Sequence, residues 1–263
     1  MLSTFLFCKT EKPTEIIVVG TQHHPVPNFN SDTLFNILED VKPDYILREI
    51  DSSFFTSDFR HKSTLNSNEG MASEKYVKKH PTTKLRPFGF EGRNEYRINI
   101  GSRPTDGLTT ALLDSLNKAN LLSASEAEIY NKFQALLEPL KVLASKSPEN
   151  FNNPTTDSIC EERQHYQYKM LAKITNVRDE FATHFHTKPN GQKISYRDGY
   201  QLAGDFWDLR NQTMAKNIMR IAEQNKGKRI VVTTGFMHRY YLLKELKRLT
   251  EGKDIILKEY YEK

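Results

Sequence analysis

The 263-residue sequence predicts an α/β fold, in which helices cover a mostly parallel central sheet and a helical insertion interrupts the pattern. Short apolar runs rich in β-branched residues recur along the chain, and stretches with helical periodicity lie between them. Two of these runs, near opposite ends of the chain, are each followed by Gly-x-x-His. Alternating strands and helices are typical of parallel sheets with right-handed crossovers, and 37% hydrophobic residues suffice for one large domain.

Five segments have the composition of strands and end at glycine, charged or turn-forming residues. The first is the apolar run that starts at Ile16. The other four expected strands are Asp44–Asp51, Leu85–Gly92, Lys228–Gly235 and Asp254–Tyr261. The clearest is Lys228–Gly235, which leads into the second Gly-x-x-His.

Helices are expected between and after these strands. Ser31 or Asp32 can cap a helix that Pro43 ends, which gives a strand, helix, strand unit. A long apolar stripe predicts a helix over Gly204–Lys228, directly before the clearest strand. An amphipathic helix should follow that strand and end at Gly252.

The middle of the chain, at about 101–200, reads as a helical insertion without a convincing strand. Its best helix begins at Ser123, where Glu126 completes a capping box, and its apolar face continues to Leu140. We therefore expect residues 15–263 to form a single domain that carries this insertion.

Residues 1–14 are expected to be a flexible N-terminus. Their apolar run meets Cys8 and resembles the end of a bacterial lipoprotein signal, which would make Cys8 a lipid anchor on an exported protein. The alternative is an ordinary apolar N-terminus on a cytoplasmic protein. Cys8 and Cys160 lie far apart without a C-x-x-C spacing, so no disulfide framework or zinc finger is expected. No stretch has the length and apolar character of a transmembrane span.

The charge pattern argues against a nucleic-acid partner. The net charge is +5, but lysine and arginine are scattered among nearly as many acids. Neither a basic run nor basic residues interleaved with aromatic ones occurs, as nucleic-acid binding would favour. The expected partner is instead a peptide or a small-molecule substrate, and the oligomeric state stays open.

The repeated Gly-x-x-His places a histidine after each of two strands, in "VVGTQH" (Val18–His23) and in "TTGFMH" (Thr233–His238). The carboxyl ends of parallel strands share one edge, where open α/β sheets bind their ligands. If the two strands are neighbours, His23 and His238 can therefore reach one metal ion or one substrate. The adjacent His24 is expected to be a bystander.

Acids are expected at the same edge, because Glu49 and Asp51 close the second strand and Glu91 closes the third. His23, Glu49, His238 and Glu91 are candidate ligands of zinc, manganese or cobalt, which suit mixed nitrogen and oxygen donors. A bound metal would turn water into a nucleophile for amide or ester hydrolysis. Without a metal, one histidine can act as general base while an acid orients it.

Each of these residues also has a purely structural interpretation. Glu49 can pair with Arg48 or a lysine, and Glu91 can pair with Arg93 or Arg97. A histidine at the end of a strand is often a surface or capping residue, and a binding module would need no catalytic group at all. These alternatives stay open at the level of the sequence.

Four features resemble the TraB/PrgY/TIKI superfamily, whose clan includes the erythromycin esterases and the ChaN-like haem-binding proteins. They are the Gly-Thr-x-His at Gly20–His23, the "ILREID" strand with Glu49, the Arg-Asn pair Arg210 and Asn211, and the closing Gly-x-x-His at Gly235–His238. They occur in the order that the superfamily has, whereas the helical middle corresponds only loosely.

The resemblance implies a metal-dependent, peptidase-like hydrolase whose site lies between the two Gly-x-x-His turns. His23 and His238 would be ligands or bases, Glu49 a ligand or general base, and Arg210 a partner for an anion or oxyanion. The same resemblance also implies an alternative, a non-catalytic module that binds haem, a metal or a signalling peptide.

Overall fold

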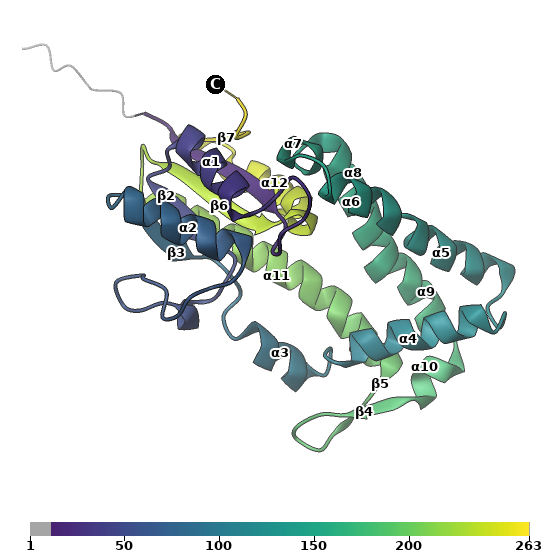
Figure 1. The fold of residues 1–263 in the computed structure, drawn as a ribbon. Helices are drawn as coiled ribbons and strands as arrows, with labels where there is room; N and C mark the ends of the chain where they lie inside the picture. The colour runs from purple at the N-terminus through teal and green to yellow at the C-terminus, as the bar shows by residue number, and fades with distance from the viewer. Residues whose placement is uncertain (1–11, 263) are drawn as a thin grey trace, which may run out of the picture.

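A five-stranded, all-parallel sheet forms the centre of the computed structural model, which describes residues 12–262 (Figure 1). The strand order is β3-β2-β6-β1-β7. The strands are β1 (Thr14–Thr21), β2 (Tyr45–Arg48), β3 (Lys84–Pro87), β6 (Arg229–Gly235) and β7 (Ile255–Lys258). Cys8, the expected lipid-anchor position, lies outside the described residues.

All five expected strands belong to this sheet, which confirms the predicted fold class. The segments expected at Asp44–Asp51 and Leu85–Gly92 are shorter than predicted, because the chain leaves the sheet after Arg48 and Pro87. Strand β1 pairs with β6 in parallel from Glu15 opposite Arg229 to Thr21 opposite Gly235. The two strands that precede the Gly-x-x-His turns are therefore direct neighbours.

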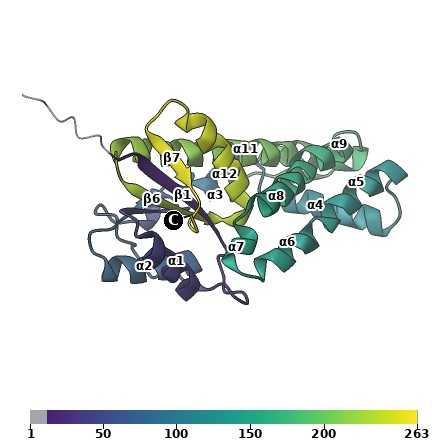
Figure 2. The ribbon, with the colours of Figure 1, turned by 90° about the horizontal axis from the view of Figure 1, so that it is seen from above.

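Helices cover both faces of the sheet (Figure 2). Ile17 and Val19 of β1 pack into the layer that contains α1 (Ser31–Val41) and α2 (Asn68–Lys79). Ile16 and Val18 point to the other face, which α11 (Tyr196–Gln224) and α12 (Phe236–Thr250) cover. This alternation follows from the period of two along a strand, and the apolar residues on both faces explain why β1 is a continuous apolar run.

The helix boundaries correct the sequence prediction in three places. Asn30 caps α1, rather than Ser31 or Asp32, because its side chain accepts from the backbone N–H of Asp32 at 2.9 Å and of Thr33 at 3.0 Å. Helix α11 begins eight residues before Gly204, where the Ser195 side chain caps it. Helix α2, between β2 and β3, was not expected.

The expected helical insertion is present and extends away from the sheet in Figure 1. It contains α3 (Arg93–Ile100), α4 (Thr105–Lys118), α5 (Ala124–Ala135), α6 (Leu137–Ala144), α7 (Pro148–Phe151), α8 (Pro154–His165), the π-helical turn η2 (Tyr166–Met170), α9 (Leu171–Thr175) and α10 (Asp179–Thr183). In the part of the chain that the structure describes, no helix has the length and apolar character needed to cross a membrane.

Two details of the insertion differ from the prediction. The Ser123 and Glu126 capping box is confirmed. The helix that it begins ends at Ala135, however, and α6 is a separate helix, because Pro139 has no N–H for a helical backbone hydrogen bond. The expectation of no strand is wrong, because β4 (Phe185–Thr187) and β5 (Lys193–Ser195) form an antiparallel hairpin. Strands of three residues are too short to show a recognisable alternation.

Candidate active site

The two Gly-x-x-His turns lie side by side at the carboxyl edge of the sheet. Gly20 is opposite Thr234, and Thr21 is opposite Gly235. A Cβ atom at Gly235 would lie 3.2 Å from Nε2 of His23 and 3.9 Å from Oε2 of Glu49. Glycine at this position therefore leaves the space in which an imidazole and a carboxylate approach each other.

His23 lies in the loop after β1 and is held by an acid from another element. Its Nδ1 is 2.8 Å from Oε1 of Glu69, in the first turn of α2. The His23 side chain is 57% exposed, whereas that of Glu69 is only 5% exposed. Because the carboxylate accepts a hydrogen bond from Nδ1–H, Nε2 is the basic nitrogen and stays accessible. The hydrogen bond from Glu69 outweighs burial and raises the pKa of His23 above its ordinary 6.5.

Glu69 is itself fixed from two sides. The Thr21 hydroxyl at the end of β1 donates to its carboxylate. Arg48 is fully buried at the end of β2 and donates to the Glu69 backbone carbonyl at 2.9 Å and to Ser73 Oγ at 2.7 Å. Arg48 thus holds the start of α2 against the sheet. It does not pair with Glu49, so that structural alternative is wrong.

Glu49 follows β2 and binds the second turn. Its Oε2 accepts from the Gly235 N–H at 2.9 Å and from the Thr234 hydroxyl, and its Oε1 pairs with Arg210. Burial disfavours the ionised carboxylate. The charge of Arg210 and the two hydrogen bonds outweigh burial, and the pKa of Glu49 falls well below its ordinary 4.5. Glu49 is therefore a fixed negative charge near neutral pH.

His238 lies in the first turn of α12 and is buried. Its Nδ1 is 2.7 Å from Oδ1 of Asn211, which can only accept, so Nδ1 carries the proton. Its Nε2 accepts from Arg210 at 2.9 Å. The Trp207 ring stacks on the imidazole with centroids 4.4 Å apart. Burial lowers the pKa of His238 to about 3, so the ring is neutral.

Arg210, from the middle of α11, lies between these two groups. One terminal nitrogen pairs with Glu49, and the other donates to His238. The side chain is 11% exposed. Each terminal nitrogen therefore already has one partner, and the geometry gives Arg210 a positioning role between Glu49 and His238.

The expected metal site does not fit these side chains. The Arg210 guanidinium binds both Glu49 and His238, so a cation already occupies the position that a metal ion would need to bridge them. Among residues 12–262, no three His, Cys, Asp or Glu side chains form a group that could hold a metal ion. The donor set thus differs from an open zinc, manganese or cobalt site.

Glu91, the fourth expected ligand, binds elsewhere. Its carboxylate accepts from the Ser52 N–H at 3.0 Å and from the Ser52 hydroxyl at 2.9 Å. It pairs with neither Arg93 nor Arg97, since Arg97 pairs with Asp106 instead. Glu91 does line a cleft of about 500 Å³ that Glu49 and Arg210 also line.

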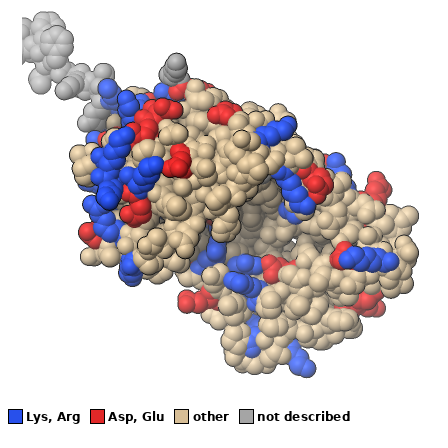
Figure 3. Space-filling view, viewed as in Figure 1, with Lys and Arg blue, Asp and Glu red and all other residues tan. Residues whose placement is uncertain are grey.

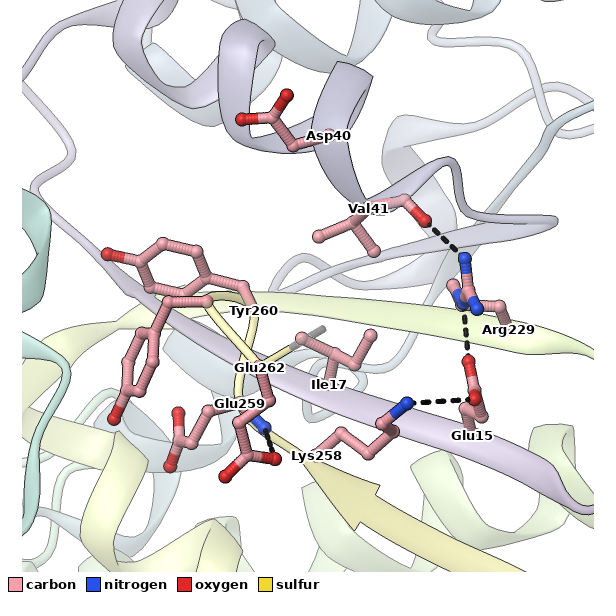
Figure 4. Close-up of a pocket in the computed structure, with 10 residues that line it drawn as sticks. Glu15, Ile17, Asp40, Val41, Arg229, Lys258, Glu259, Tyr260 and Glu262 are labelled. Carbon is pink, nitrogen blue, oxygen red and sulfur yellow. Dashed lines mark hydrogen bonds and ion pairs between the residues drawn. The ribbon is translucent and has the colours of Figure 1, made fainter.

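A second cleft, of about 490 Å³, opens at the amino end of the strands (Figure 4). Three of its charged side chains are bound to one another. Arg229 pairs with Glu15 and donates to the Val41 carbonyl at 2.8 Å, and Lys258 lies 3.3 Å from Glu15. This cleft lies at the opposite edge from the histidines, and its ion pairs leave it without a distinct reactive group.

Comparison with protein-family models, with curated proteins and with solved structures found no match for this chain. The resemblance to the TraB/PrgY/TIKI superfamily therefore rests on the residues themselves. The sequence pattern led to His23, Glu49, Arg210 and His238, and it missed Glu69. The signal for Glu69 was present in the Ser67 cap and the apolar spacing of Ala72, Tyr76 and Val77, which together indicate a helix.

Proposed function

We propose that the protein is a hydrolase of ester or amide bonds, in which His23 acts as general base on a water molecule. The observation that carries this proposal is an exposed imidazole bound through Nδ1 to the buried carboxylate of Glu69. A base of this kind works best when its pKa is close to the working pH. The hydrogen bond from Glu69 raises the pKa of His23 above its ordinary 6.5, which makes Nε2 a stronger base.

The reaction follows from the position of the imidazole. Nε2 of His23 takes a proton from water as the oxygen attacks the substrate carbonyl, and the same proton then passes to the leaving group. Glu69 holds the proton on Nδ1 and stabilises the imidazolium that forms. Glu49, Arg210 and His238 keep the second turn in place beside Nε2. The step uses water and this chain's own side chains.

Substitution of His23 by glutamine tests the proposal. Purified protein is assayed against a panel of activated esters and short peptides, with and without a chelator. We expect His23→Gln to lower kcat/KM by about 10²–10⁴-fold, the usual contribution of general base catalysis. His24→Gln is the matched control, because His24 is an exposed neighbour that has no hydrogen-bond partner among residues 12–262.

Two results would contradict the proposal. One is equal hydrolysis by the wild type and His23→Gln, and the other is a panel that stays intact. An intact panel together with a ligand that co-purifies and is lost from His238→Ala would favour the binding module instead.

A further inference from the structure

The cleft beside Glu49 contains an arginine without a partner. Arg93 begins α3 and lines the cleft together with Glu49 and Arg210. Among residues 12–262, Arg93 has no hydrogen bond and no ion pair, although it is half-buried. The arginines next to it are bound, since Arg97 pairs with Asp106 and Arg103 donates to Asn94 at 3.0 Å.

None of the four acids that line the cleft forms an ion pair with Arg93. Glu49 pairs with Arg210, Glu91 binds Ser52, and Asp51 accepts from Ser53. Glu95 also lines the cleft, but it is exposed and forms no ion pair with Arg93. The guanidinium of Arg93 is therefore left without a bound partner in a partly enclosed space.

Three features make this placement unfavourable for the protein alone. Burial removes solvent from the guanidinium, and the charge of Arg210 repels it, so both lower the pKa of Arg93. A cation in the first turn of a helix also opposes the helix dipole. The neighbouring Arg210 also has a buried Nε atom that has no hydrogen-bond partner among the described residues. Local conflicts of this kind concentrate at functional sites.

The surface at this place carries basic side chains among acidic ones. In Figure 3, Lys and Arg side chains lie at the hollow between the sheet part and the helical insertion, with acidic side chains beside them. Four acids and two arginines line the cleft, and Arg93 is the arginine of the two that no side chain of residues 12–262 binds. An arginine fork matches the two oxygens of a carboxylate or a phosphate, and such hydrogen bonds are about twice as strong as neutral ones.

We infer that the substrate of the proposed hydrolase carries an anionic group, a carboxylate or a phosphate, that Arg93 binds in this cleft. The inference rests on the proposed function. Glu49 connects the cleft with the proposed catalytic histidine. It lines the cleft, and its carboxylate and the His23 imidazole both lie near Gly235. The anionic group is therefore held apart from the bond that is cleaved, and it orients the substrate.

A binding measurement separates this inference from the proposed function, because it needs no turnover. Calorimetry compares inorganic phosphate, succinate and the neutral succinamide as probes of the wild type. We expect one of the two anions to bind and succinamide not to bind. Whether phosphate or succinate binds more tightly identifies the anionic group.

Variants then locate the contact. Arg93→Met should weaken anion binding by about tenfold or more, the effect of losing a charged hydrogen bond, and Arg93→Lys should retain part of it. Arg103→Met is the matched control, because it removes a nearby positive charge that is already bound to Asn94. Circular dichroism establishes that each variant is folded.

The outcomes are distinct. Absence of anion binding in the wild type, or equal binding by folded Arg93→Met, would overturn the inference even if His23→Gln abolishes hydrolysis. Conversely, anion binding that depends on Arg93 would support it even if no ester or amide is cleaved. Where hydrolysis occurs, Arg93→Met should raise KM for an anionic substrate and leave KM for its neutral methyl ester unchanged.

Discussion

The two Gly-x-x-His turns have the same pattern of residues and opposite chemistry. His23 is exposed in a loop, bound to a carboxylate, and its pKa is raised. His238 is buried in a helix, bound to an amide and an arginine, and its pKa is lowered to about 3. The pattern fixes where each imidazole lies, at adjacent strand ends. The partners and the burial then decide what each imidazole can do.

The largest expected effects come from removing each histidine in turn. His23→Ala should lower kcat/KM by about 10²–10⁴-fold and lower the free energy of unfolding by only about 1 kcal/mol, since it removes one hydrogen bond to Glu69 from an exposed side chain. His238→Ala should lower the free energy of unfolding by about 2–4 kcal/mol, because it leaves a cavity and an unpaired nitrogen on Arg210. Urea unfolding and hydrolysis assays of both variants check this. Equal loss of stability in the two variants would break the comparison.

Stability against pH should distinguish the histidines by sign. Because the pKa of His238 is lowered in the folded protein, the unfolded chain binds the proton more readily. The free energy of unfolding should therefore hold above pH 6.5 and fall as the pH drops below 6.5, by up to about 1.4 kcal/mol per pH unit. The raised pKa of His23 has the opposite effect, because the folded protein binds this proton more readily. Its contribution to the free energy of unfolding is complete below pH 6.5 and is lost as the pH rises through the pKa of His23 in the folded protein. Urea unfolding from pH 5 to 8 measures both. His238→Gln should remove the first dependence and His23→Gln the second, and unchanged slopes would contradict these assignments.

Neutralising the acid partner should make His23 more like an ordinary histidine. The pH–rate profile should rise as His23 loses its proton, with a midpoint above 6.5 in the wild type. Glu69→Gln should move that midpoint down toward 6.5, because it removes the carboxylate that raises the pKa of His23. Glu74→Gln is the control, because Glu74 lies on the same helix but pairs with His61. A midpoint that Glu69→Gln leaves in place would show that Glu69 does not set the basicity of His23.

A methyl group at the second turn should disturb the first histidine. The Cβ of Gly235→Ala would lie 3.2 Å from Nε2 of His23, so the exposed imidazole must move. We expect roughly a tenfold loss of kcat/KM, as positioning errors at a catalytic base produce, and little loss of stability. Gly107→Ala is the control, because its Cβ would have no neighbour within 4 Å. Equal activity of both variants would mean that Nε2 is not in use.

Metal removal should have the smallest effect. Because Arg210 already binds Glu49 and His238, we expect dialysis against a chelator to leave kcat/KM unchanged. Metal analysis of the wild type beside His23→Ala and His238→Ala checks the same point. Activity that disappears with the chelator and returns with zinc or manganese would restore the metal centre that the sequence predicts.

The comparison also shows how far a sequence can be interpreted. The strands β1 and β6 were predictable because their apolar β-branched runs end in glycine, and their pairing places the two Gly-x-x-His turns side by side. The metal site was not predictable in the same way. Whether a carboxylate binds a metal ion or Arg210 depends on contacts 161 residues apart in the chain. Glu69 was missed because it reaches His23 from a helix in a weakly apolar segment.

Helix α11 has a consequence for how a substrate reaches the site. Its 29 residues form one uninterrupted rod of about 43 Å, which packs against the sheet layer and also against α4 and α9 of the insertion. Since Arg210 lies on this rod, the two parts share a stiff element and have no loop there about which they could swing closed. Substrate would therefore enter a cleft that is already open, and the rate of turnover would depend on chemistry or product departure more than on any closing motion.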